Sequence, residues 1–408
     1  MKIITLTKQQ FDAFSSTHRY RSFYQSSLYG ELMMRHGFNI HYIGLVDNNH
    51  NLISASLILY KKIFNIFKYA YAPRGFLIEY EDKALLKLFT SKLKRLLLKQ
   101  NFLFIKIDPY VVRDSNILLN LKSAGYIKQQ TLDDFKLLKP TNFALLKLNT
   151  NIKTTFFSFK RDIRRKIKSA LKKGITIHKG NANDIETIYN FAPKVIKKKQ
   201  SLTYFNNYYQ VFKSQNKAEV YYAKLNPSAL LTVAKNKYQE ENKININLVK
   251  RLQQDKKNND ILNKKIASDN LLNLYKRHLI EASKLFNHYP HGLIIGGCFI
   301  IIYDNQVNVI LSSYHPKYKR FNPIPLLYWA LITNAYKKHY HAINLNGLSS
   351  HSNGDDPYQR YSQFKLKFGS TKTELIGEFD LPINLPLYHF IQKSKLITNY
   401  ITKIIKKN

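Results

Sequence analysis

The sequence has few acidic residues for its length. Only 26 aspartates and glutamates stand against 65 lysines and arginines, so that the chain of 408 residues carries a formal net charge of +39. This excess predicts attraction to polyanions, either nucleic acid or an anionic membrane face. The abundance of Lys, Asn, Ile and Tyr is also typical of an AT-rich coding sequence. An alternative explanation is therefore that drift in base composition supplies most of the charge, while selection for function determines where the charge lies.

The chain also has a single cysteine and no long apolar run. Cys298 lies in the apolar stretch 293–300, where we expect a buried structural thiol. One cysteine excludes a disulfide within the chain, and no Cys/His spacing typical of a zinc site is present. The apolar stretch is shorter than the roughly 20 residues of a membrane span, and residues 1–7 lack the apolar segment of a signal peptide. We therefore expect a cytoplasmic protein.

A hydrophobic content of 44%, with 13% aromatic residues, is that of a globular protein, and the length allows two or three domains. Residues 1–150 alternate between strand and helix patterns. We expect a hairpin of strands at 41–46 and 52–60, and a further strand at 102–107. That strand ends at Asp108-Pro109, where the carboxyl group is either a turn-forming residue or a site carboxylate.

A strongly basic helix is predicted at residues 158–173. Ile163, Ile167 and Leu171 form one apolar stripe, and Gly174 is the expected C-terminal stop. The other faces carry eight cations, which are Lys160, Arg161, Arg164, Arg165, Lys166, Lys168, Lys172 and Lys173. Like charges this dense repel one another unless an anionic partner binds them. We expect this helix to bind phosphate groups, with a merely solvated face as the alternative.

Residues 228–287 are polar, free of glycine and predicted to be helical. The second half repeats apolar residues in the steps of three and four of a coiled-coil seam, at Leu272, Tyr275, Leu279, Ala282 and Phe286. The stretch 255–260 would make the reversal between two antiparallel helices. We interpret the segment as a helical hairpin inserted into a second unit, where it acts as a lever or a docking surface for a large partner.

After this arm the chain alternates again between strands and helices. A strand at 306–313, a helix at 325–338 and a strand at 342–345 lead into Gly347. This order is the layout of small acyltransferase domains, and residues 1–150 show a similar one. The sequence therefore favours two copies of one fold, although the internal repeat is faint.

The most informative stretch lies near the C-terminus, where a turn, an acidic loop and a lysine between aromatic residues follow one another. It contains Gly347, Asp355-Asp356-Pro357, Phe364-Lys365 and residues 377–380. A lysine seated between aromatic neighbours can present one fixed positive charge to a developing oxyanion or to a phosphate. The alternative is a solvated lysine at the edge of a strand.

Taken in order, these segments resemble the FemABX family of peptidoglycan bridge-forming aminoacyltransferases. The resemblance runs nearly end to end and depends on order and spacing, because each segment alone is weak. Besides the basic helix, the hairpin and Phe364-Lys365, the matching segments are 24–31, 72–80, 105–109, 170–174 and 376–380.

The resemblance implies a mixed α/β (α+β) fold of two acetyltransferase-like (GNAT) domains in tandem. The first would comprise residues 1–150 together with 380–408, and the second residues 151–379. An antiparallel coiled-coil arm, residues 228–287, would be inserted in the second.

The resemblance also implies an activity, the transfer of an amino acid (Gly, Ala or Ser) from aminoacyl-tRNA to a peptidoglycan precursor. The acceptor would be the side-chain amine of the third stem-peptide residue, on a lipid-linked or UDP-linked muropeptide. The family's chemistry needs no metal, no cofactor and no covalent enzyme intermediate. It places the protein at the inner face of the plasma membrane, as a peripheral protein that can form homo-oligomers or pair with a related transferase. The amphipathic tail 386–408 suits a membrane surface or packing on the first domain.

The family's functional residues carry over to several positions of this sequence. Lys365 would stabilise the oxyanion or neutralise the leaving RNA terminus, and Asp108 would orient or deprotonate the attacking amine. The residues expected to contact substrate are Phe364, Tyr204, Arg35, Lys199 and Tyr314. Those expected to bind RNA phosphates are Lys160, Arg161, Arg164, Arg165 and Lys168.

The chain departs from the family pattern at Met33, Gln200 and Leu311, where polar precursor-binding residues or a Tyr-Gly pair are common. Three interpretations stay open: neighbouring cations substitute, the acceptor differs, or catalysis has decayed. Two alternatives to the leading function follow. One is a catalytically weak scaffold that binds tRNA or membrane beside an active relative, and the other is a transferase acting on an anionic lipid.

Overall fold

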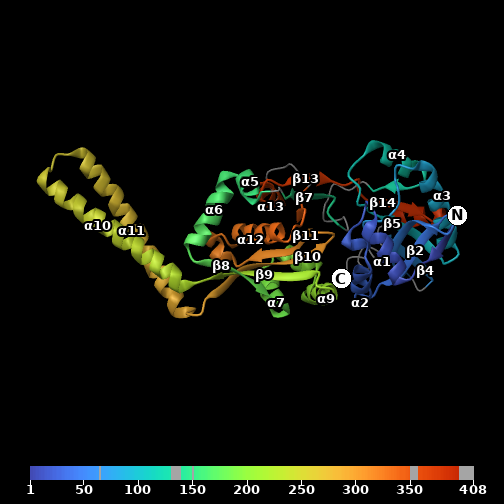
Figure 1. The fold of residues 1–408 in the computed structure, drawn as a ribbon, viewed down its shortest axis with the longest axis horizontal. Helices are drawn as coiled ribbons and strands as arrows, with labels where there is room; N and C mark the ends of the chain where they lie inside the picture. Colours follow the sequence, from blue (N-terminus) through green and yellow to red (C-terminus); the bar gives the residue numbers. More distant parts are fainter. Residues whose placement is uncertain (64–65, 130–138, 149–150, 350–356, 395–408) are drawn as a thin grey trace.

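The computed structural model describes residues 1–63, 66–129, 139–148, 151–349 and 357–394, except for the side chains of Val195, Lys199, Pro357 and Tyr358. The fold is mixed α/β, and its described part contains two seven-stranded sheets and a long helical hairpin. The two sheet-containing units lie side by side, and the hairpin projects from the far end of the second unit (Figure 1). Among the described residues, no helix has the length and apolarity that a bilayer crossing requires.

The first sheet is built mainly from the N-terminal part of the chain. Its strand order is β1-β2-β3-β4-β5-β14-β6, and every pair is antiparallel except β4–β5. The strands are β1 (Lys2–Thr5), β2 (Asn39–Val46), β3 (Leu52–Ile63), β4 (Phe67–Ala72), β5 (Phe102–Ile107), β6 (Ile127–Lys128) and β14 (Phe379–Pro382). The predicted hairpin is confirmed, since β2 and β3 pair with Tyr42 opposite Leu57.

Helices cover both faces of this sheet because side chains alternate along each strand. Leu57 and Leu59 of β3 belong to one apolar cluster with α1 and α2, whereas Ile58 belongs to a second cluster with α3 and α4. The helices of this unit are α1 (Lys8–Thr17), the short helix η1 (Phe23–Gln25), α2 (Ser27–Arg35), α3 (Lys83–Leu98), α4 (Ser115–Ser123) and α14 (Leu385–Lys393).

The second sheet has the order β13-β7-β12-β11-β10-β9-β8, and again one pair, β11–β12, is parallel. Its strands are β7 (Asn142–Lys147), β8 (Ile175–Gly180), β9 (Ala218–Leu225), β10 (Leu293–Tyr303), β11 (Gln306–Tyr314), β12 (Ala342–Gly347) and β13 (Thr371–Glu374). The strands β11 and β12 pair only between Gln306–Asn308 and Ala342–Asn344. Beyond that point they separate, because β11 continues beside β10 and β12 continues beside β7.

One face of the second sheet packs against α12 and the basic helix, and the other face packs against α7 and α9. The helices of this unit outside the arm are α5 (Ile152–Ser158), α6 (Arg161–Lys172), α7 (Ala182–Asn190), α8 (Lys194–Lys199), α9 (Leu202–Lys213), the short helix η2 (Pro316–Phe321), α12 (Pro323–Lys337) and α13 (Pro357–Leu366). The helix α9 also packs on the first unit, where the Phe23 ring lies 6.2 Å from that of Phe212. One apolar cluster therefore runs through both units.

The boundary expected at residue 150 is wrong by one strand. The strand β7 pairs with β12 and β13 in the second sheet, because Phe143, Leu145 and Leu146 find their partners and packing there. The chain returns to the first sheet at β14, which lies between β5 and β6.

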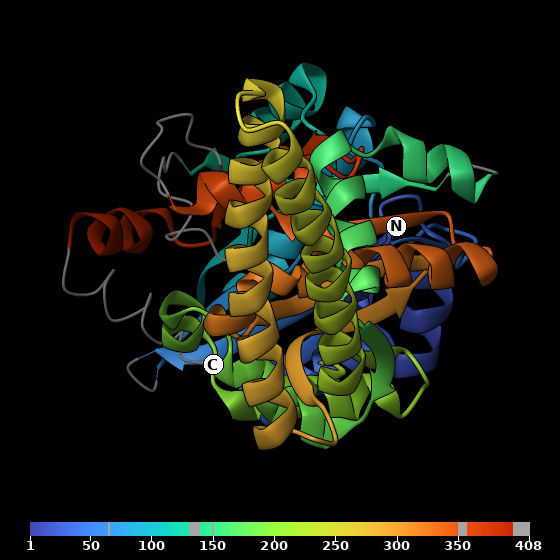
Figure 2. The ribbon, with the colours of Figure 1, turned by 90° about the vertical axis from the view of Figure 1, so that its left-hand side faces the viewer.

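The inserted arm consists of α10 (Pro227–Gln254) and α11 (Asn259–His288), which lie side by side (Figure 2). Ala282 is buried in the seam as expected, but Phe286 is exposed and Leu285 is buried in its place. The seam also encloses polar groups, since the Ser268 hydroxyl donates to Glu241 at 2.6 Å. A hydrogen-bonded polar layer of this kind favours one register of the two helices over others.

Candidate active site

A cleft of about 230 Å³ opens where the two units meet. The first unit lines it with three arginines, Arg19, Arg21 and Arg74, whereas β11 and β12 contribute amides such as Asn308 and Asn344. One wall is therefore mainly cationic and the other mainly neutral and hydrogen-bonding. Such walls suit a ligand that carries anionic groups together with amide or hydroxyl groups.

Asp108 lies just beneath the first-unit wall. The carboxylate follows β5 directly and is only 1% exposed. Its Oδ1 accepts hydrogen bonds from the Tyr71 hydroxyl at 3.0 Å and from the Arg74 backbone N–H at 2.7 Å. Its Oδ2 lies 3.3 Å from Nη1 of Arg74, whose Nη2 donates to the Pro140 carbonyl at 2.6 Å. The carboxylate thus holds Arg74 in position, and Arg74 is the residue that lines the cleft.

Lys139 is a second cation beside this network. Its Nζ donates to the Tyr29 hydroxyl at 3.0 Å and lies 4.1 Å from the centre of the Tyr24 ring and 5.9 Å from that of Tyr71. Burial lowers the pKa of Lys139 to about 8. An ammonium group over aromatic faces is stabilised by their quadrupoles, while the Tyr24 ring itself lines the cleft.

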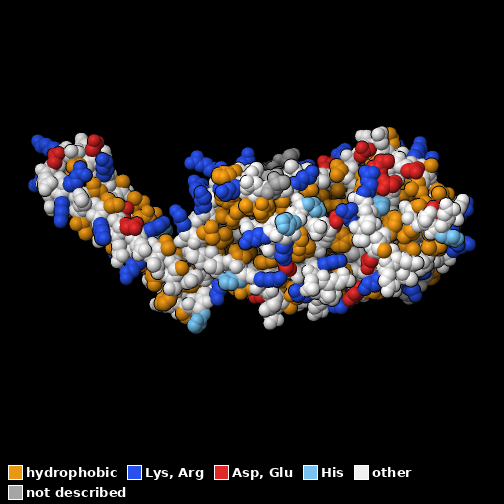
Figure 3. All heavy atoms as spheres, in the orientation of Figure 1, with side chains coloured by type: hydrophobic (Ala, Val, Ile, Leu, Met, Phe, Trp, Pro, Cys, Tyr) orange, Lys and Arg blue, Asp and Glu red, His pale blue; other side chains and the backbone are white. Residues whose placement is uncertain are grey.

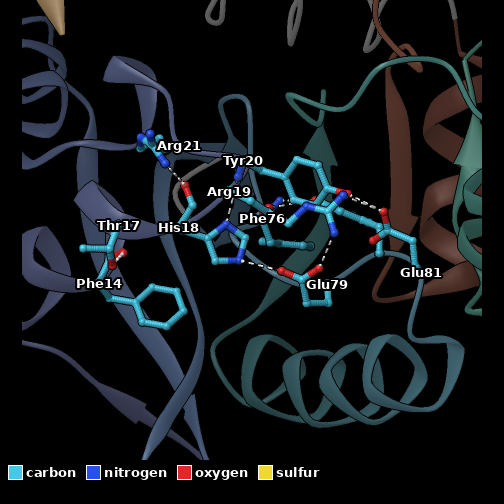
Figure 4. Close-up of polar contacts among 10 residues, drawn as sticks. Phe14, Thr17, His18, Arg19, Tyr20, Arg21, Phe76, Glu79 and Glu81 are labelled. Atoms are coloured by element: carbon cyan, nitrogen blue, oxygen red, sulfur yellow. Dashed lines mark hydrogen bonds and ion pairs between the residues drawn. The ribbon is translucent and has the colours of Figure 1, made fainter. Parts of the chain in front are cut away.

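Arg19, which lines the cleft, belongs to a group of paired charges on the first unit (Figure 4). Arg19 donates to Glu79 at 3.0 Å and to Glu81 at 3.1 Å, and the Tyr20 hydroxyl donates to Glu81 at 2.7 Å. The Nδ1 atom of His18 accepts the Tyr20 backbone N–H at 3.1 Å. Burial, followed by the adjacent arginine charges, lowers the pKa of His18 to about 4, so its ring is neutral near pH 7.

Arg21 connects the two units across the mouth of the cleft. Its Nε lies 2.5 Å from Oδ2 of Asp304, which stands in the turn between β10 and β11. Both side chains are about one-third exposed. A ligand phosphate that enters the cleft would therefore meet Arg21 already paired with a carboxylate.

Lys365 lies on the second unit, near the end of α13, and not at a strand edge. Its Nζ donates to the Gly347 carbonyl at 2.6 Å, and Gly347 lines the cleft. Burial lowers the pKa of Lys365 to about 8. The ammonium group therefore stands directly behind the second wall, separated from the cleft by one backbone carbonyl.

Phe364 and Tyr204, two of the expected substrate contacts, are packing residues. The ring of Phe364 lies 6.1 Å from Tyr328 and 5.3 Å from Phe368 in the second core. Tyr204 lies in the first turn of α9 and is 4% exposed, with its ring 5.0 Å from that of His36. Neither side chain lines the cleft between the sheets.

Arg35 and Tyr314, two further expected contacts, also lie outside the cleft lining. Arg35 ends α2 and donates to Gln210 of α9 at 3.2 Å and to Glu31 at 3.1 Å. Tyr314 ends β11 beside Tyr361 of α13, and burial, then the neighbouring Tyr314, raises the pKa of Tyr361. The side chain of Lys199 lies outside the described residues.

The basic helix is shorter than predicted, because α5 ends at Ser158 and α6 begins at Arg161. Ile163, Ile167 and Ala170 are buried, whereas Leu171, expected in the stripe, is 55% exposed. A spacing of seven residues keeps Ala170 closer to the buried face than Leu171. The five cations expected to bind RNA are all at least partly exposed, and cations gather over this edge in Figure 3, namely Lys160, Arg161, Arg164, Arg165 and Lys168.

The three positions that depart from the family pattern have structural roles. Met33 and Leu311 are buried in the apolar cluster shared by the two units. The Gln200 backbone carbonyl accepts the Tyr189 hydroxyl at 3.1 Å. Met33 and Leu311 therefore offer no polar group to a ligand.

The sequence pattern indicated no role for Arg74, Tyr71 or Lys139. Arg74 stood within a matching segment, and its place before Gly75 in a Pro-Arg-Gly turn was the only local signal. Lys139 carries no such signal, because the tyrosines around it come from η1, α2 and β4.

Comparison with known proteins shows a likeness over nearly the whole chain. The lipid II:glycine glycyltransferases of Staphylococcus epidermidis and Staphylococcus aureus are each 25% identical, covering 100% of this chain and 99% of theirs. That of Staphylococcus saprophyticus is 24% identical and covers 97% of this chain and 96% of its own. A crystal structure of FemX has the same fold, with a TM-score of 0.75 at 21% identity over 96% of this chain and 100% of that one. A model of the FemAB family matches residues 6–395, so the chain belongs to the FemAB family.

Proposed function

We propose that the protein transfers an aminoacyl group, with glycine as the first candidate, from aminoacyl-tRNA to the stem peptide of lipid II. The acceptor is the side-chain amine of the third stem residue. The observation that carries the proposal is the cleft between the sheets. Arg74, held by Asp108, lies on one wall, and Gly347, backed by Lys365, lies on the other. The relatives named lipid II:glycine glycyltransferase support glycine and lipid II as the substrates.

The proposed reaction is a single displacement at an ester carbonyl. The acceptor amine attacks the carbonyl carbon, a C–N bond forms, and the bond from that carbon to the ribose oxygen of the RNA breaks. The amine nitrogen loses a proton, and the ribose oxygen gains one. In this scheme the Lys365 ammonium turns from the Gly347 carbonyl to the negative oxygen of the tetrahedral intermediate and stabilises it. Asp108 acts by holding Arg74 in place beside the incoming amine, because the carboxylate lies behind that arginine.

We also propose that the two sheets are two copies of one acetyltransferase-like unit. Each sheet has one parallel pair of strands within otherwise antiparallel neighbours, β4–β5 in the first and β11–β12 in the second. The first unit would then end before β7 and be completed by β14, and the arm α10–α11 would be a coiled coil inserted in the second.

Both proposed substrates are polyanions, which agrees with the net charge of +39. Lipid II carries its pyrophosphate at the membrane surface, so the proposal places the protein at the inner face of the plasma membrane. The basic helix α6 would bind the RNA.

The test combines purified protein, lipid II and tRNA charged with glycine, alanine or serine in separate reactions. We expect a stem peptide that is heavier by one residue, detected by mass spectrometry, with glycyl-tRNA giving the fastest transfer. Uncharged tRNA together with free glycine is the control. Absence of product with all three charged tRNAs would refute the proposal.

The burial of Met33 and Leu311 favours one second candidate, a scaffold that binds RNA or membrane beside an active relative. It predicts binding of charged tRNA without transfer, and transfer that emerges only when a related transferase is added. An aminoacylated anionic lipid in the same reactions would instead indicate a lipid acceptor.

A further inference from the structure

A second basic surface lies at the opposite end of the second unit from the cleft. The arm leaves the body at an angle, so that a notch opens between α6 and the first turns of the arm (Figures 1 and 3). We call a group of neighbouring basic residues from the end of α6, the two arm helices and η2 the arm-root cluster, which comprises Lys173, Lys237, Arg277, His278 and Arg320.

The C-terminal end of α6 is attached to the arm. The Asn226 backbone N–H, just before α10, donates to the Gly174 carbonyl at 3.1 Å. A Cβ atom on Gly174 would lie 2.7 Å from the Cβ of Ala229, and the φ of +74° at this residue also favours glycine. The close approach brings the end of a basic helix against the base of α10, so their cations share one surface.

The members of the arm-root cluster lie close enough to affect one another. Lys173 Nζ lies 3.3 Å from the Arg320 carbonyl, and Lys237 Nζ lies 5.8 Å from the centre of the Tyr275 ring. Burial, and then the charges of Lys173, Arg320, Lys237 and Arg277, lower the pKa of His278. Glu281 pairs with Arg320. Converging like charges raise the free energy of the unliganded surface and favour a bound anion.

The helix α6 connects this cluster to the candidate active site. At its other end, the Lys160 backbone N–H donates to the Lys367 carbonyl at 2.9 Å, two residues beyond Lys365. The helix has 12 residues, which corresponds to a length of about 18 Å. At about 3.4 Å per phosphate along one strand of a duplex, that length covers roughly five phosphates.

We propose that the notch binds the sugar–phosphate backbone of the helical stem of the RNA substrate, whose 3′ end lies near Lys365. The inference rests on the proposed function and names the surface that holds its nucleic acid. An anionic membrane is the competing partner. The recessed position of the cluster favours a rounded polyanion that enters the notch, because a flat bilayer would be held off by the projecting arm.

The test uses two double variants that each remove two charges from exposed positions of the same arm. Lys237→Gln/Arg277→Gln changes the arm root, and Lys256→Gln/Lys257→Gln changes the distal turn between α10 and α11. Binding of uncharged tRNA is measured across a salt series. The root variant should bind at least fivefold more weakly at low salt. Its slope of log K against log salt should be shallower by about 0.7–0.9 for each phosphate that it no longer neutralises. The distal variant should stay within twofold of the wild type.

Equal weakening in the two variants, or unchanged binding in the root variant, would overturn the proposal. A charge-preserving variant, Lys237→Arg/Arg277→Lys, should restore binding, which separates the effect of charge from altered folding. If the root variant binds RNA normally but no longer binds vesicles of anionic phospholipid, the partner is the membrane and the proposal is wrong.

A short RNA that carries the aminoacyl ester distinguishes this proposal from the proposed function. A few 3′-terminal nucleotides do not reach the notch, so the root variant should transfer from this donor at the wild-type rate and be impaired only with full-length tRNA. If the wild type transfers from neither donor, the proposed function fails. If the wild type transfers from both and the root variant is unimpaired with full-length tRNA, only the notch proposal fails.

Discussion

The two walls of the cleft hold their charges in different ways. On the first unit, Asp108 interacts with the Tyr71 hydroxyl, the Arg74 backbone and the Arg74 guanidinium. On the second unit, the one hydrogen bond that the Lys365 ammonium donates within the described part of the chain goes to the Gly347 carbonyl. A carboxylate with several donors is fixed in place, whereas a desolvated ammonium with one neutral acceptor can change its partner and its protonation. The first wall is therefore suited to holding a substrate in position. The second wall is suited to changing its hydrogen bond and its charge during the reaction.

The two arginine–aspartate pairs at the cleft also differ, in how far their side chains are exposed to solvent. The side chains of Arg74 and Asp108 are 6% and 1% exposed, whereas those of Arg21 and Asp304 are 33% and 35% exposed. Removing one partner of a buried pair leaves the other charge in surroundings that solvate it poorly. At an exposed pair, water takes the place of the removed partner. Only the first pair should matter strongly for stability.

The largest expected effect is that of Arg74→Ala on folding. Loss of the guanidinium leaves Asp108 buried and uncompensated, so the free energy of unfolding should fall by about 3–5 kcal/mol, measured by urea denaturation. The double variant Arg74→Met/Asp108→Leu removes both charges and should recover part of that loss. If Arg74→Ala lowers the free energy of unfolding by less than about 1 kcal/mol, the buried and the exposed pair do not differ in this way.

The next effect is that of Lys365→Ala on catalysis. If the ammonium stabilises the oxyanion, its removal should raise the barrier by roughly 2–4 kcal/mol, or about 30- to 900-fold in kcat/KM for aminoacyl transfer. Lys372→Ala, on the neighbouring strand β13, removes an exposed lysine and should leave the rate within twofold. An unchanged rate in Lys365→Ala would exclude the proposed role.

The pH dependence sharpens the contrast further. Because burial lowers the pKa of Lys365 to about 8, its cation is lost as the pH rises through 8, and a rate that depends on the cation should fall above that value. In the unfolded chain the same lysine stays protonated to about pH 10.4, so its contribution to stability rises with pH between these values. Transfer and stability should therefore change in opposite directions.

The comparison variant for this pH profile is Lys365→Arg, whose guanidinium stays charged throughout. Its rate should lack the decline above pH 8 that is assigned to Lys365. Lys139 also has a pKa lowered to about 8, so a decline that persists in Lys365→Arg would point to Lys139 instead.

The smallest effect is expected at the exposed pair. Arg21→Ala should lower the free energy of unfolding by only about 0.2–1 kcal/mol, and high salt should remove most of that difference. Measurement at low and high ionic strength, beside Arg74→Ala, tests this directly. A loss as large as that of Arg74→Ala would mean that the Arg21–Asp304 pair holds the two units together.

Much of the fold was readable from local pattern. The β2–β3 hairpin and the strand that ends at Asp108 have strong periodicity and clear turns, and both are observed. The assignment of β7 failed because a strand's own sequence does not name the sheet it joins. Phe286 and Leu171 were misplaced for a related reason, since on a helix two adjacent apolar residues compete for one buried position and packing chooses between them.

Order along the chain determined the element types, the basic face of α6, the position of Asp108 at a strand end and the membership of a family. These follow from local propensity and from the spacing of residues. The cleft, the pairing of Arg74 with Asp108, the placement of Lys139 among tyrosines and the bond from Lys365 to Gly347 were decided only by tertiary structure. Each of them joins segments that are distant in sequence, and desolvation, which sets their charges and pKa values, depends on what the folded chain places around a group.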